Sequence, residues 1–429
     1  MKNKKETLLI LTILITICII IFNRDKLYEA KYTEPKDTLL AITINGEIST
    51  TFPTTKYYET SVECTTGTGK VEWNGTKWVL TTNGITKGST KCNATFITKV
   101  PTFAETILAN NKVKAPITTP GATISTASEA LLASTEDDYG TSYYFRGAVT
   151  NNYVEFANKC WRIVRVGGDG SVKLILHNDN PTGAANPCDA ANNSASAAFA
   201  HYNGSTYTSR FNENYDDNAY IGFKYGTPGS SKYETTHANT NKSTILTNLE
   251  AWYGKNNLKN YEKVIADTVW CNDKTNVTDT SYDPWSITPN GLGYAKNVTY
   301  YGATQRLVGT SGSAGGTGPS LKCNGELSKI NSKVGLITAD ELALAGYAYN
   351  ISNTTTYLQE NATDTYWWSL SPYIFDGGCA VVWGVNGSSG GFDDYYVDST
   401  FGVRPSISLK STTNVTGNGT SDSPFIIST

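Results

Sequence analysis

The chain has 429 residues, enough for two or three domains, one of which can have a sizeable core. Its formal net charge is -3, only 17% of its residues are charged, and no Lys/Arg cluster follows the N-terminus, so a nucleic-acid partner is not expected. Met1 is the single methionine, and the chain is rich in Thr, Asn, Ser, Gly and Tyr. This composition is more typical of a secreted or surface β-rich protein than of a cytosolic enzyme.

An apolar run at residues 8–22 follows three lysines in the first five positions. The run is short for a membrane span, which needs about 20 residues, so a cleaved signal peptide is the alternative. However, Phe22, Asn23 and Arg24 offer no small-x-small cleavage site. We therefore expect residues 1–30 to be a signal anchor, a transmembrane helix with its basic end in the cytoplasm. This predicts a single-pass protein of a bacterial cell membrane, with the bulk of the chain extracellular.

The cysteines outside the apolar run suggest a disulfide framework. In chain order they form three plausible local pairs and leave Cys379 over: Cys64 with Cys92, Cys160 with Cys188, and Cys271 with Cys323. Disulfides are the default in an oxidising compartment, although the pairing cannot be deduced from sequence.

Residues 36–100 show short β-like runs separated by Asn-Gly turns, at 39–44, 70–73, 77–80 and 94–97. Trp73 and Trp78 are candidates for the core of a small sandwich. The pattern predicts an immunoglobulin-like all-β domain that serves as a stalk, with a separate binding role as the alternative. Residues 101–135, with several prolines among Thr, Ala and Ser, are expected to be a linker.

From residue 136 the pattern predicts a second domain that ends at 412. Strands are expected at 142–146 and 153–156, and a hairpin at 161–176 turns through the Gly-rich residues 167–170. Arg162 and Arg165 lie on opposite faces of the hairpin strand, and we interpret both as structural or solvated.

Two helices are expected between long polar loops at 177–240 and 272–320, and a strand is expected after the second loop. Apolar residues at 245, 246, 249, 252 and 253 predict an amphipathic helix over 243–253, and a second helical piece is expected at 258–265. Residues 334–337 are expected to form a strand. It leads into a capping box, Thr338 with Glu341, which opens a short helix that ends by Gly346.

Strands with tight turns are expected from 367 to 409, before a C-terminal tail at 413–429. Within this region, residues 369–403 contain no Lys, Arg, His, Glu, Gln or Met. Tyr, Phe, Asp, Gly, Ser and Asn dominate instead, as in the contact loops of antibodies. Exposed aromatic rings beside hydrogen-bond acceptors bind at low entropic cost, so we expect a contact patch at 373–401. Its expected ligand-binding residues are Tyr373, Phe375, Asp376, Asn386, Ser388, Phe392, Asp393, Asp394, Tyr395, Tyr396, Asp398 and Phe401. The expected scaffold residues are Trp368, Trp383 and Arg404.

Residues 137–410 resemble the C-type lectin fold. The resemblance rests on the motifs at 161–165, 335–341, 367–372 and 402–405, which read WRIVR, GLITADE, WWSLSP and GVRP. More narrowly, the chain resembles the branch that contains formylglycine-generating enzymes and the variable proteins of bacterial diversity-generating retroelements. The implied fold class is α+β, with a C-type-lectin-like head preceded by the all-β stalk and the transmembrane helix.

In the retroelement-diversified proteins, the C-terminal segment is rewritten at template adenines. Asn codons there can become codons for Tyr, Asp, Ser, Gly, Cys, Thr, Ala, Val, Ile or Phe, but not Trp, Lys, Glu, Gln or Met. The resemblance thus implies that Trp383 is fixed and that Cys379 is an unselected product. A Tyr/Gly/Ser-rich hairpin with a chance bias is the alternative.

Enzyme chemistry is less well supported than binding. Formylglycine-generating enzymes use a cysteine pair, whereas Cys379 stands alone in this region. The three histidines, His177, His201 and His237, lack catalytic or metal-ligating spacing. Asp393 and Asp394 are adjacent, so on a strand they would point to opposite faces rather than form a glycosidase pair. We expect no cofactor and no metal.

The expected function is therefore binding of a protein or glycan on another cell, a host or a phage. The alternatives are a surface enzyme acting on glycans and a non-diversified structural protein. The enzyme predicts a deep cleft with paired carboxylates, whereas binding predicts a shallow exposed patch.

Overall fold

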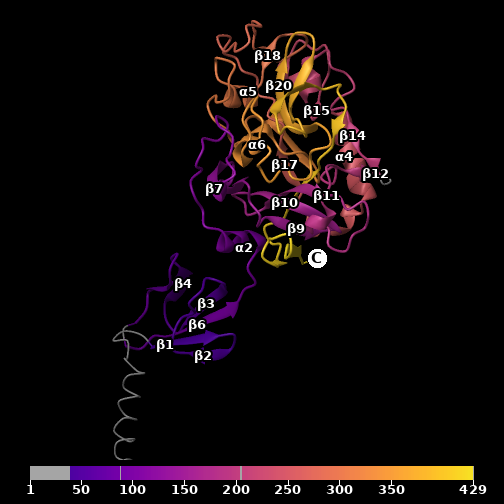
Figure 1. Cartoon of the computed structure of the whole chain (residues 1–429). Coiled ribbons are helices and arrows are strands. Elements are labelled where there is room, and N and C mark those ends of the chain that lie inside the picture. The colour runs from indigo at the N-terminus through magenta and orange to yellow at the C-terminus, as the bar shows by residue number, and fades with distance from the viewer. Residues whose placement is uncertain (1–38, 87, 203–204, 429) are drawn as a thin grey trace, which may run out of the picture. The chain divides into compact units, whose positions relative to one another are not determined.

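The computed structural model describes residues 39–428 apart from 87, 203 and 204 (Figure 1). The chain divides into two compact units, one that ends at Pro101 and one that begins at Thr102. Each has its own hydrophobic core. The three predicted disulfides are present, and Cys379 is the free cysteine among the described residues. The pairing prediction is confirmed.

The smaller unit is a sheet with the strand order β2-β1-β6-β3, next to the hairpin β4–β5. Its strands are β1 (Leu39–Ile44), β2 (Glu47–Ser49), β3 (Tyr58–Cys64), β4 (Thr68–Trp73), β5 (Trp78–Asn83) and β6 (Lys91–Thr98). Asn45 and Gly46, both with positive φ, form the two-residue turn between β1 and β2. The rings of Trp78 and Phe96 lie 5.3 Å apart in the core. Cys64 and Cys92 are direct partners across β3 and β6, which explains why they pair.

The first sheet of the larger unit has the strand order β24-β11-β10-β9-β26-β25, with β8 joining β10 to β7. The strands are β7 (Ala130–Asp137), β8 (Gly140–Gly147), β9 (Tyr153–Phe156), β10 (Lys159–Val166), β11 (Val172–Asn178), β24 (Ser406–Leu409), β25 (Val415–Thr416) and β26 (Phe425–Ile427). The predicted hairpin of β10 and β11 is present and almost wholly buried.

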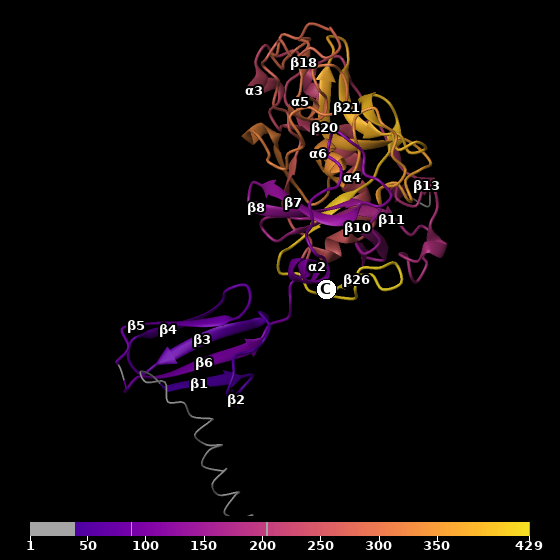
Figure 2. The same ribbon diagram turned by 60° about the vertical axis from the view of Figure 1, so that its left-hand side comes forward.

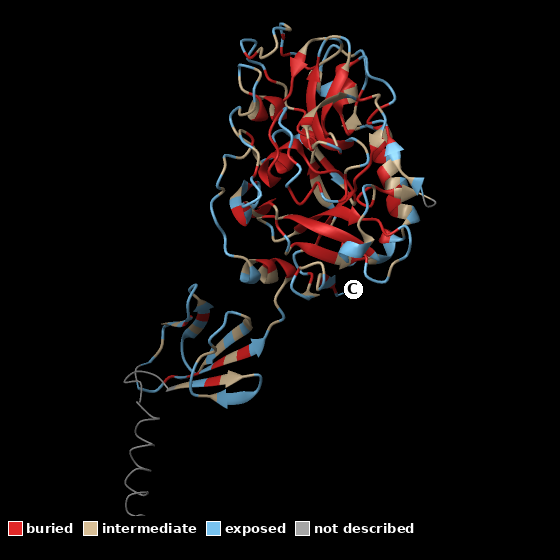
Figure 3. Cartoon of the chain, in the orientation of Figure 1, coloured by how far each residue is buried: buried red, intermediate tan, exposed pale blue. Residues whose placement is uncertain are grey.

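The second sheet has the strand order β14-β23-β20-β21-β22, with β18 paired to β20. Its strands are β14 (Thr208–Ser209), β18 (Thr299–Tyr300), β20 (Trp367–Phe375), β21 (Ala380–Val385), β22 (Phe392–Tyr396) and β23 (Phe401–Gly402). Every residue of β20 and β21 is buried, so these two strands run through the core (Figure 3).

Short helices and strands complete the larger unit. The helices are α2 (Phe103–Asn110), α3 (Tyr233–Thr236), α4 (Thr244–Lys255), α5 (Gly302–Leu307) and α6 (Ala339–Ala345). The 3-10 turns are η1 (Ala190–Asn192), η2 (Asn218–Ile221), η3 (Leu258–Tyr261) and η4 (Glu326–Ser328). The remaining strands are β12 (His201–Tyr202), β13 (Ser205–Thr206), β15 (Lys224–Tyr225), β16 (Asn241–Lys242), β17 (Thr268–Cys271) and β19 (Lys329–Ser332).

Helix α6 begins with the predicted capping box. The Thr338 side chain accepts a hydrogen bond from the Glu341 backbone N–H, and the Glu341 carboxylate accepts one from the Thr338 N–H. Helix α6 contacts both β8 and β20, and α5 also contacts β20. The two helices therefore lie against the strand that leads into the predicted contact patch.

The prediction of an N-terminal transmembrane helix, and of a membrane location that depended on it, is corrected. Among the described residues, none of the helices has both the length and the apolar character needed to span a bilayer. The chain is mostly sheet, with 35% strand against 13% helix, and the α+β class is compatible with this. Residues 1–30, where the span was expected, lie outside the described residues.

Three further segments differ from expectation. The expected linker contains α2 and β7, and the expected tail contributes β25 and β26 to the first sheet. The Phe103 N–H donates to the Thr413 carbonyl at 2.7 Å, and the Phe103 and Phe425 rings meet at 5.2 Å, so these two segments pack together (Figure 2). Residues 334–337 follow the end of β19 and are buried. They form an isolated bridge from Gly335 to Ser406 instead of the expected strand.

Candidate functional site

The predicted contact patch is built on β20, β21 and β22. β21 lies between the other two strands, with Trp383 opposite Asp394 and Gly384 opposite Asp393. Because β21 is buried on both faces, Val382 and Gly384 do not face solvent, contrary to a simple alternation. A Cβ on Gly384 would meet the ring of Tyr395, so this close packing requires glycine.

Four aromatic side chains form an inner cluster on one face of these strands. The Tyr373 ring lies 4.8 Å from Trp383, 5.3 Å from Trp285 and 6.2 Å from Tyr349. The Tyr373 hydroxyl donates to the Tyr349 hydroxyl at 3.1 Å. The contacts are edge-on or tilted, the arrangements that aromatic pairs prefer. The cluster therefore holds β20 and β21 against the loops that carry Trp285 and Tyr349.

Asp394 lies at the edge of this inner cluster and is half-buried. Burial, followed by a hydrogen bond with the neighbouring Asp393 and the charge of that residue, raises the pKa of Asp394 to about 7. Adjacent residues of a strand usually point apart, yet these two carboxyl groups interact. The prediction that Asp393 and Asp394 do not form a glycosidase pair stays a prediction.

A second, outer aromatic group consists of Tyr366, Tyr395 and Phe401. Their ring centroids lie 5.0 to 5.2 Å apart, with Tyr366 stacked on Phe401 and Tyr395 edge-on to both. The Asn386 amide donates to the Tyr366 hydroxyl at 2.9 Å. All three rings are partly exposed, so together with Asn386 they present aromatic and polar groups to solvent. We call Tyr366, Tyr395 and Phe401 the outer aromatic surface.

The structure divides the predicted contact residues by exposure. Tyr373, Phe375 and Phe392 are buried, so they belong to the core and cannot contact a ligand directly. Asp376, Ser388 and Tyr396 are exposed, with Tyr396 at 51%. The other six are intermediate: Asn386, Asp393, Asp394, Tyr395, Asp398 and Phe401. The patch is thus about half as aromatic as the sequence suggested.

Asp376 and Asn386 fix the two turns of the patch as well as lining it. The Asp376 carboxylate accepts from the N–H groups of Gly378 and Cys379 at 2.8 and 2.7 Å. The Asn386 side-chain oxygen accepts from the Ser388 N–H at 3.0 Å and from its hydroxyl at 2.9 Å. Such side-chain caps stabilise tight turns.

The three expected scaffold residues are fully buried. The Trp368 indole N–H donates to the Ser209 carbonyl at 2.8 Å, and Trp383 stacks on Phe392 at 4.6 Å. Arg404 donates to the carbonyls of Leu176 and Leu358, and burial lowers its pKa to about 10. Its guanidinium also lies 4.9 Å from the ring of Trp367. These contacts tie the patch to the first sheet.

Sequence reasoning missed Trp285, Tyr349 and Tyr366. Trp285 and Tyr349 lie in segments far from the patch in sequence, and only the fold brings them to Tyr373. Tyr366 immediately precedes the Trp-Trp pair. Its position directly before the first residue of β20 was the one sequence feature that could have pointed to a place beside the patch.

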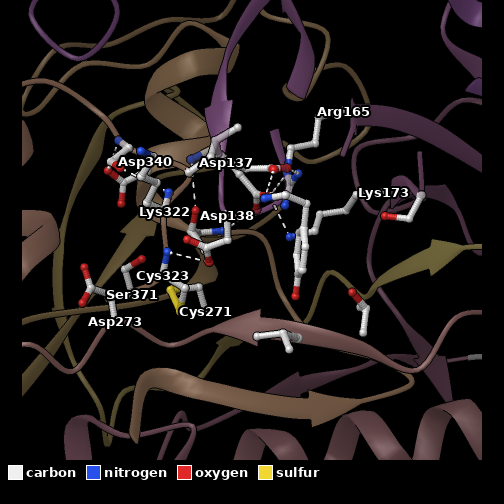
Figure 4. A pocket seen from close by; sticks show the side chains of 18 of the residues that line it. Asp137, Asp138, Arg165, Lys173, Cys271, Asp273, Lys322, Cys323, Asp340 and Ser371 are labelled. Carbon is white, nitrogen blue, oxygen red and sulfur yellow. Dashed lines mark hydrogen bonds and ion pairs between the residues drawn. A yellow bond between two sulfur atoms is a disulfide. The ribbon is translucent and has the colours of Figure 1, made fainter. Parts of the chain in front are cut away.

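A separate cleft lies between the two sheets and is lined by charged side chains (Figure 4). On one side, Glu341 accepts from Arg165 at 2.9 Å and from Lys173 at 2.7 Å. On the other, Arg306 pairs with Asp340 at 2.7 Å and with Asp273 at 2.6 Å. Burial opposes the charge on Glu341, but Lys173 and Arg165 prevail and lower its pKa to about 2.

The cleft charges neutralise one another within the protein. Asp137, the remaining buried carboxylate of the lining, pairs with Arg165 at 3.0 Å. The backbone N–H of Cys323, beside the Cys271–Cys323 disulfide, donates to Asp138 at 3.1 Å. A general acid needs a carboxyl group whose pKa is raised, and Glu341 has the opposite shift. The arrangement therefore suits cross-linking of the two sheets better than acid–base catalysis.

Comparison of the chain with models of protein families, with curated proteins and with solved structures finds no match.

Proposed function

We propose that this chain is a ligand-binding protein whose contact surface is the outer aromatic surface with the polar groups beside it. The observation that carries the proposal is the triangle of Tyr366, Tyr395 and Phe401, which is partly exposed and fixed by buried strands. Rigid aromatic rings supply contact area at low entropic cost, and binding hot spots are enriched in Tyr. The ligand is a protein or glycan carried by another cell, a host or a phage.

The surface has the form that supports binding rather than catalysis. The Asn386 amide donates to the Tyr366 hydroxyl, and Ser388, which donates to the Asn386 side chain, adds an exposed hydroxyl beside it. The charged cleft lies apart from this surface, and its buried carboxylates are held by arginine or lysine. Three disulfides are compatible with an oxidising, extracellular compartment.

We further propose that the exposed positions of the contact patch at 373–401 are diversified, as in the variable proteins of retroelements with a C-type lectin fold. Exposed positions can change without cost to the core, whereas buried ones cannot. The proposal therefore assigns variation to Asp376, Ser388, Tyr396 and Asp398. It assigns constancy to the buried members of the stretch, Phe375, Trp383, Phe392 and the glycines that pack against backbone, Gly387 and Gly390.

Sequencing of the coding stretch and its genomic surroundings tests diversification. We expect a near-identical repeat of the codons for 369–404 and a reverse-transcriptase gene nearby. The two copies should differ only at template adenines, and the differences should fall in the codons of exposed residues. Differences at other bases, or at the codons for Phe375 and Phe392, would refute diversification while leaving binding intact.

Labelled protein tests binding itself. The full chain is added to a panel of bacterial cells, host epithelial cells and phage particles, and bound protein is measured by flow cytometry or sedimentation. We expect Tyr366→Ala to reduce binding at least about tenfold, as loss of a hot-spot tyrosine does, because Tyr366 is the most exposed ring of the triangle. The matched control is Tyr139→Ala, because Tyr139 is 62% exposed and lies outside the outer aromatic surface. Equal binding by both variants would exclude this surface as the contact site.

A further inference from the structure

A second hollow of the larger unit lies away from the outer aromatic surface. Its lining comes from the β9–β10 turn, the segment after β11, β12, and the region from the end of α4 through η3. Its volume is about 420 Å³. This lies within the range of small-molecule sites, which is roughly 300–1,000 Å³.

A buried ion pair forms the base of this hollow. The Lys159 ammonium lies 2.6 Å from the Asp179 carboxylate and also donates to the Asp179 carbonyl at 3.0 Å. The Trp252 indole N–H donates to the same carboxylate at 3.2 Å. The His201 side chain is nine-tenths buried, and its Nδ1, 3.6 Å from Asp179, has no hydrogen-bond partner. The base is therefore rigid and polar, and it retains unused hydrogen-bonding capacity.

Side-chain amides form the rim. The Asn180 amide donates to the Asn158 side-chain oxygen at 3.2 Å, which leaves the amide N–H groups of Asn158 available. The Asn256 amide donates to the Trp252 carbonyl at 2.9 Å, which leaves its oxygen. Among the described residues, the Asn257 side chain has no partner, and the structure gives it no capping role. Together, the free N–H groups of Asn158, the free oxygen of Asn256 and the Asn257 amide offer both donors and acceptors, as paired hydroxyl groups require.

The backbone around the hollow is held in an uncommon conformation. Ala157, Asn158, Asn180 and Asn257 have φ between 54° and 57°. They are four of the nine non-glycine residues with positive φ in the described part of the chain. Such conformations are costly, especially for alanine, and they cluster at binding sites.

The lining has little net charge. Lys159 and Asp179 neutralise each other, and Lys255, at the mouth, stacks over Tyr202 at 5.1 Å. No further carboxylate lines the hollow among the described residues. The ring of Tyr261 adds an apolar surface. The charged pair is satisfied within the protein, so the groups left to meet a ligand are the rim amides of Asn158, Asn256 and Asn257.

From this combination we infer that the hollow is a binding site for a neutral saccharide, one or two sugar units in size. The hydroxyl groups of a sugar donate and accept hydrogen bonds, as the rim amides require. The C–H face of a pyranose packs against an aromatic ring such as that of Tyr261. Among the described residues that line the hollow, Lys255 is the one charge without a counter-charge, and it lies at the mouth over Tyr202, so the interior offers no unpaired cation to an anionic ligand.

Saturation-transfer NMR on the full chain tests the assignment. The probes are glucose, galactose, mannose and N-acetylglucosamine, with N-acetylneuraminic acid as the acidic comparison, all at millimolar concentration. The double variant Asn158→Gly/Asn257→Gly removes two rim amides, and glycine keeps the positive φ without strain. Asn350→Gly is the matched control because Asn350 is exposed, has φ 54°, and lies outside the hollow.

We expect at least one neutral sugar to bind the wild-type chain and the Asn350 variant equally. The double variant should bind it about fivefold to tenfold more weakly while keeping the wild-type thermal midpoint, because two hydrogen-bonding groups are lost. The assignment is overturned if no sugar binds, if only N-acetylneuraminic acid binds, or if the double variant binds as well as the control.

Discussion

At the scale of single residues, Asp394 connects the stability of the patch with pH. It lies against the inner aromatic cluster and beside a second carboxyl group, Asp393. With its pKa raised to about 7, Asp394 is largely protonated in mildly acidic solution, where the unfolded chain would already be ionised. Folding at higher pH must therefore place a carboxylate in an unfavourable position.

The sign of this effect can be measured with Asp394→Asn. The folded-state pKa lies above the unfolded value of about 3.9, so the stabilisation is complete below pH 4 and is lost as pH rises through 7. Asparagine cannot ionise. We expect the variant to exceed the wild type in unfolding free energy at pH 8 by on the order of 1–2 kcal/mol, after allowance for partial exposure. The difference should shrink at pH 4.5. Urea denaturation at both pH values checks this, and a difference independent of pH would contradict it.

Individual residues differ in how well their roles could be predicted. The cysteine pairs followed from their order along the chain, because local pairs were the simplest arrangement. Tyr373 and Tyr396 look alike in the sequence, yet one is buried and the other exposed. Their difference arises from Trp285 and Tyr349, which the fold brings to Tyr373 from distant segments.

At the scale of elements, helix α6 combines a local signal with a long-range connection. Glu341 caps the helix, and the same carboxylate binds Arg165 on β10 and Lys173 on β11. The cap was visible as a four-residue motif. The two ion pairs were not, because they span more than 160 residues.

Substitution can separate these two roles. Thr338→Ala removes the cap and should lower the unfolding free energy by about 1 kcal/mol. Glu341→Gln keeps a capping side chain but leaves the buried Lys173 without its counter-charge and Arg165 with Asp137 alone, so we expect a loss of about 3–5 kcal/mol. Thr102→Ala, at the equivalent capping box of α2, is the matched control and should resemble Thr338→Ala. Denaturation at neutral pH measures all three, and similar losses for Glu341→Gln and Thr338→Ala would refute the ionic role.

Elements with a local signature were predicted well, and those that depend on tertiary contacts were not. The strands β1 and β9 and the helix α4, capped by Ser243, match the expected segments to within two residues. The strands β20 and β21 are buried on both faces, so the alternation expected of a half-exposed strand does not occur. The sequence shows a short amphipathic stretch within α2 and an apolar strand-like segment at β26, but these segments were assigned to a linker and a tail because their surroundings are rich in proline, threonine and serine.

At the scale of the whole molecule, the chain has two cores of very different size. The smaller core contains Ile42, Val71, Trp78, Ala94 and Phe96. A unit of about 60 residues buries a modest fraction of its surface and is marginally stable. Its disulfide is therefore expected to contribute a large share of its stability.

The variant Cys64→Ser/Cys92→Ser tests this expectation. The disulfide closes a loop across a sequence separation of 28, so its loss should cost about 3–4 kcal/mol. Hydrogen exchange measured by mass spectrometry should accelerate in peptides from 39–101 and remain unchanged in those from 102–428. Cys271→Ser/Cys323→Ser should give the reverse pattern. Acceleration in both units for either variant would contradict independent stabilisation.

The parallel pairing of β26 with β9 has a consequence for biosynthesis. These strands lie side by side although about 270 residues separate them. At ribosomal speeds of 5–20 residues per second, β9 leaves the exit tunnel roughly 15–50 s before its partner exists. Throughout that interval the nascent chain carries an open sheet edge, and Phe103 lacks the ring of Phe425. The larger unit therefore cannot complete its first sheet until β26 has left the ribosome.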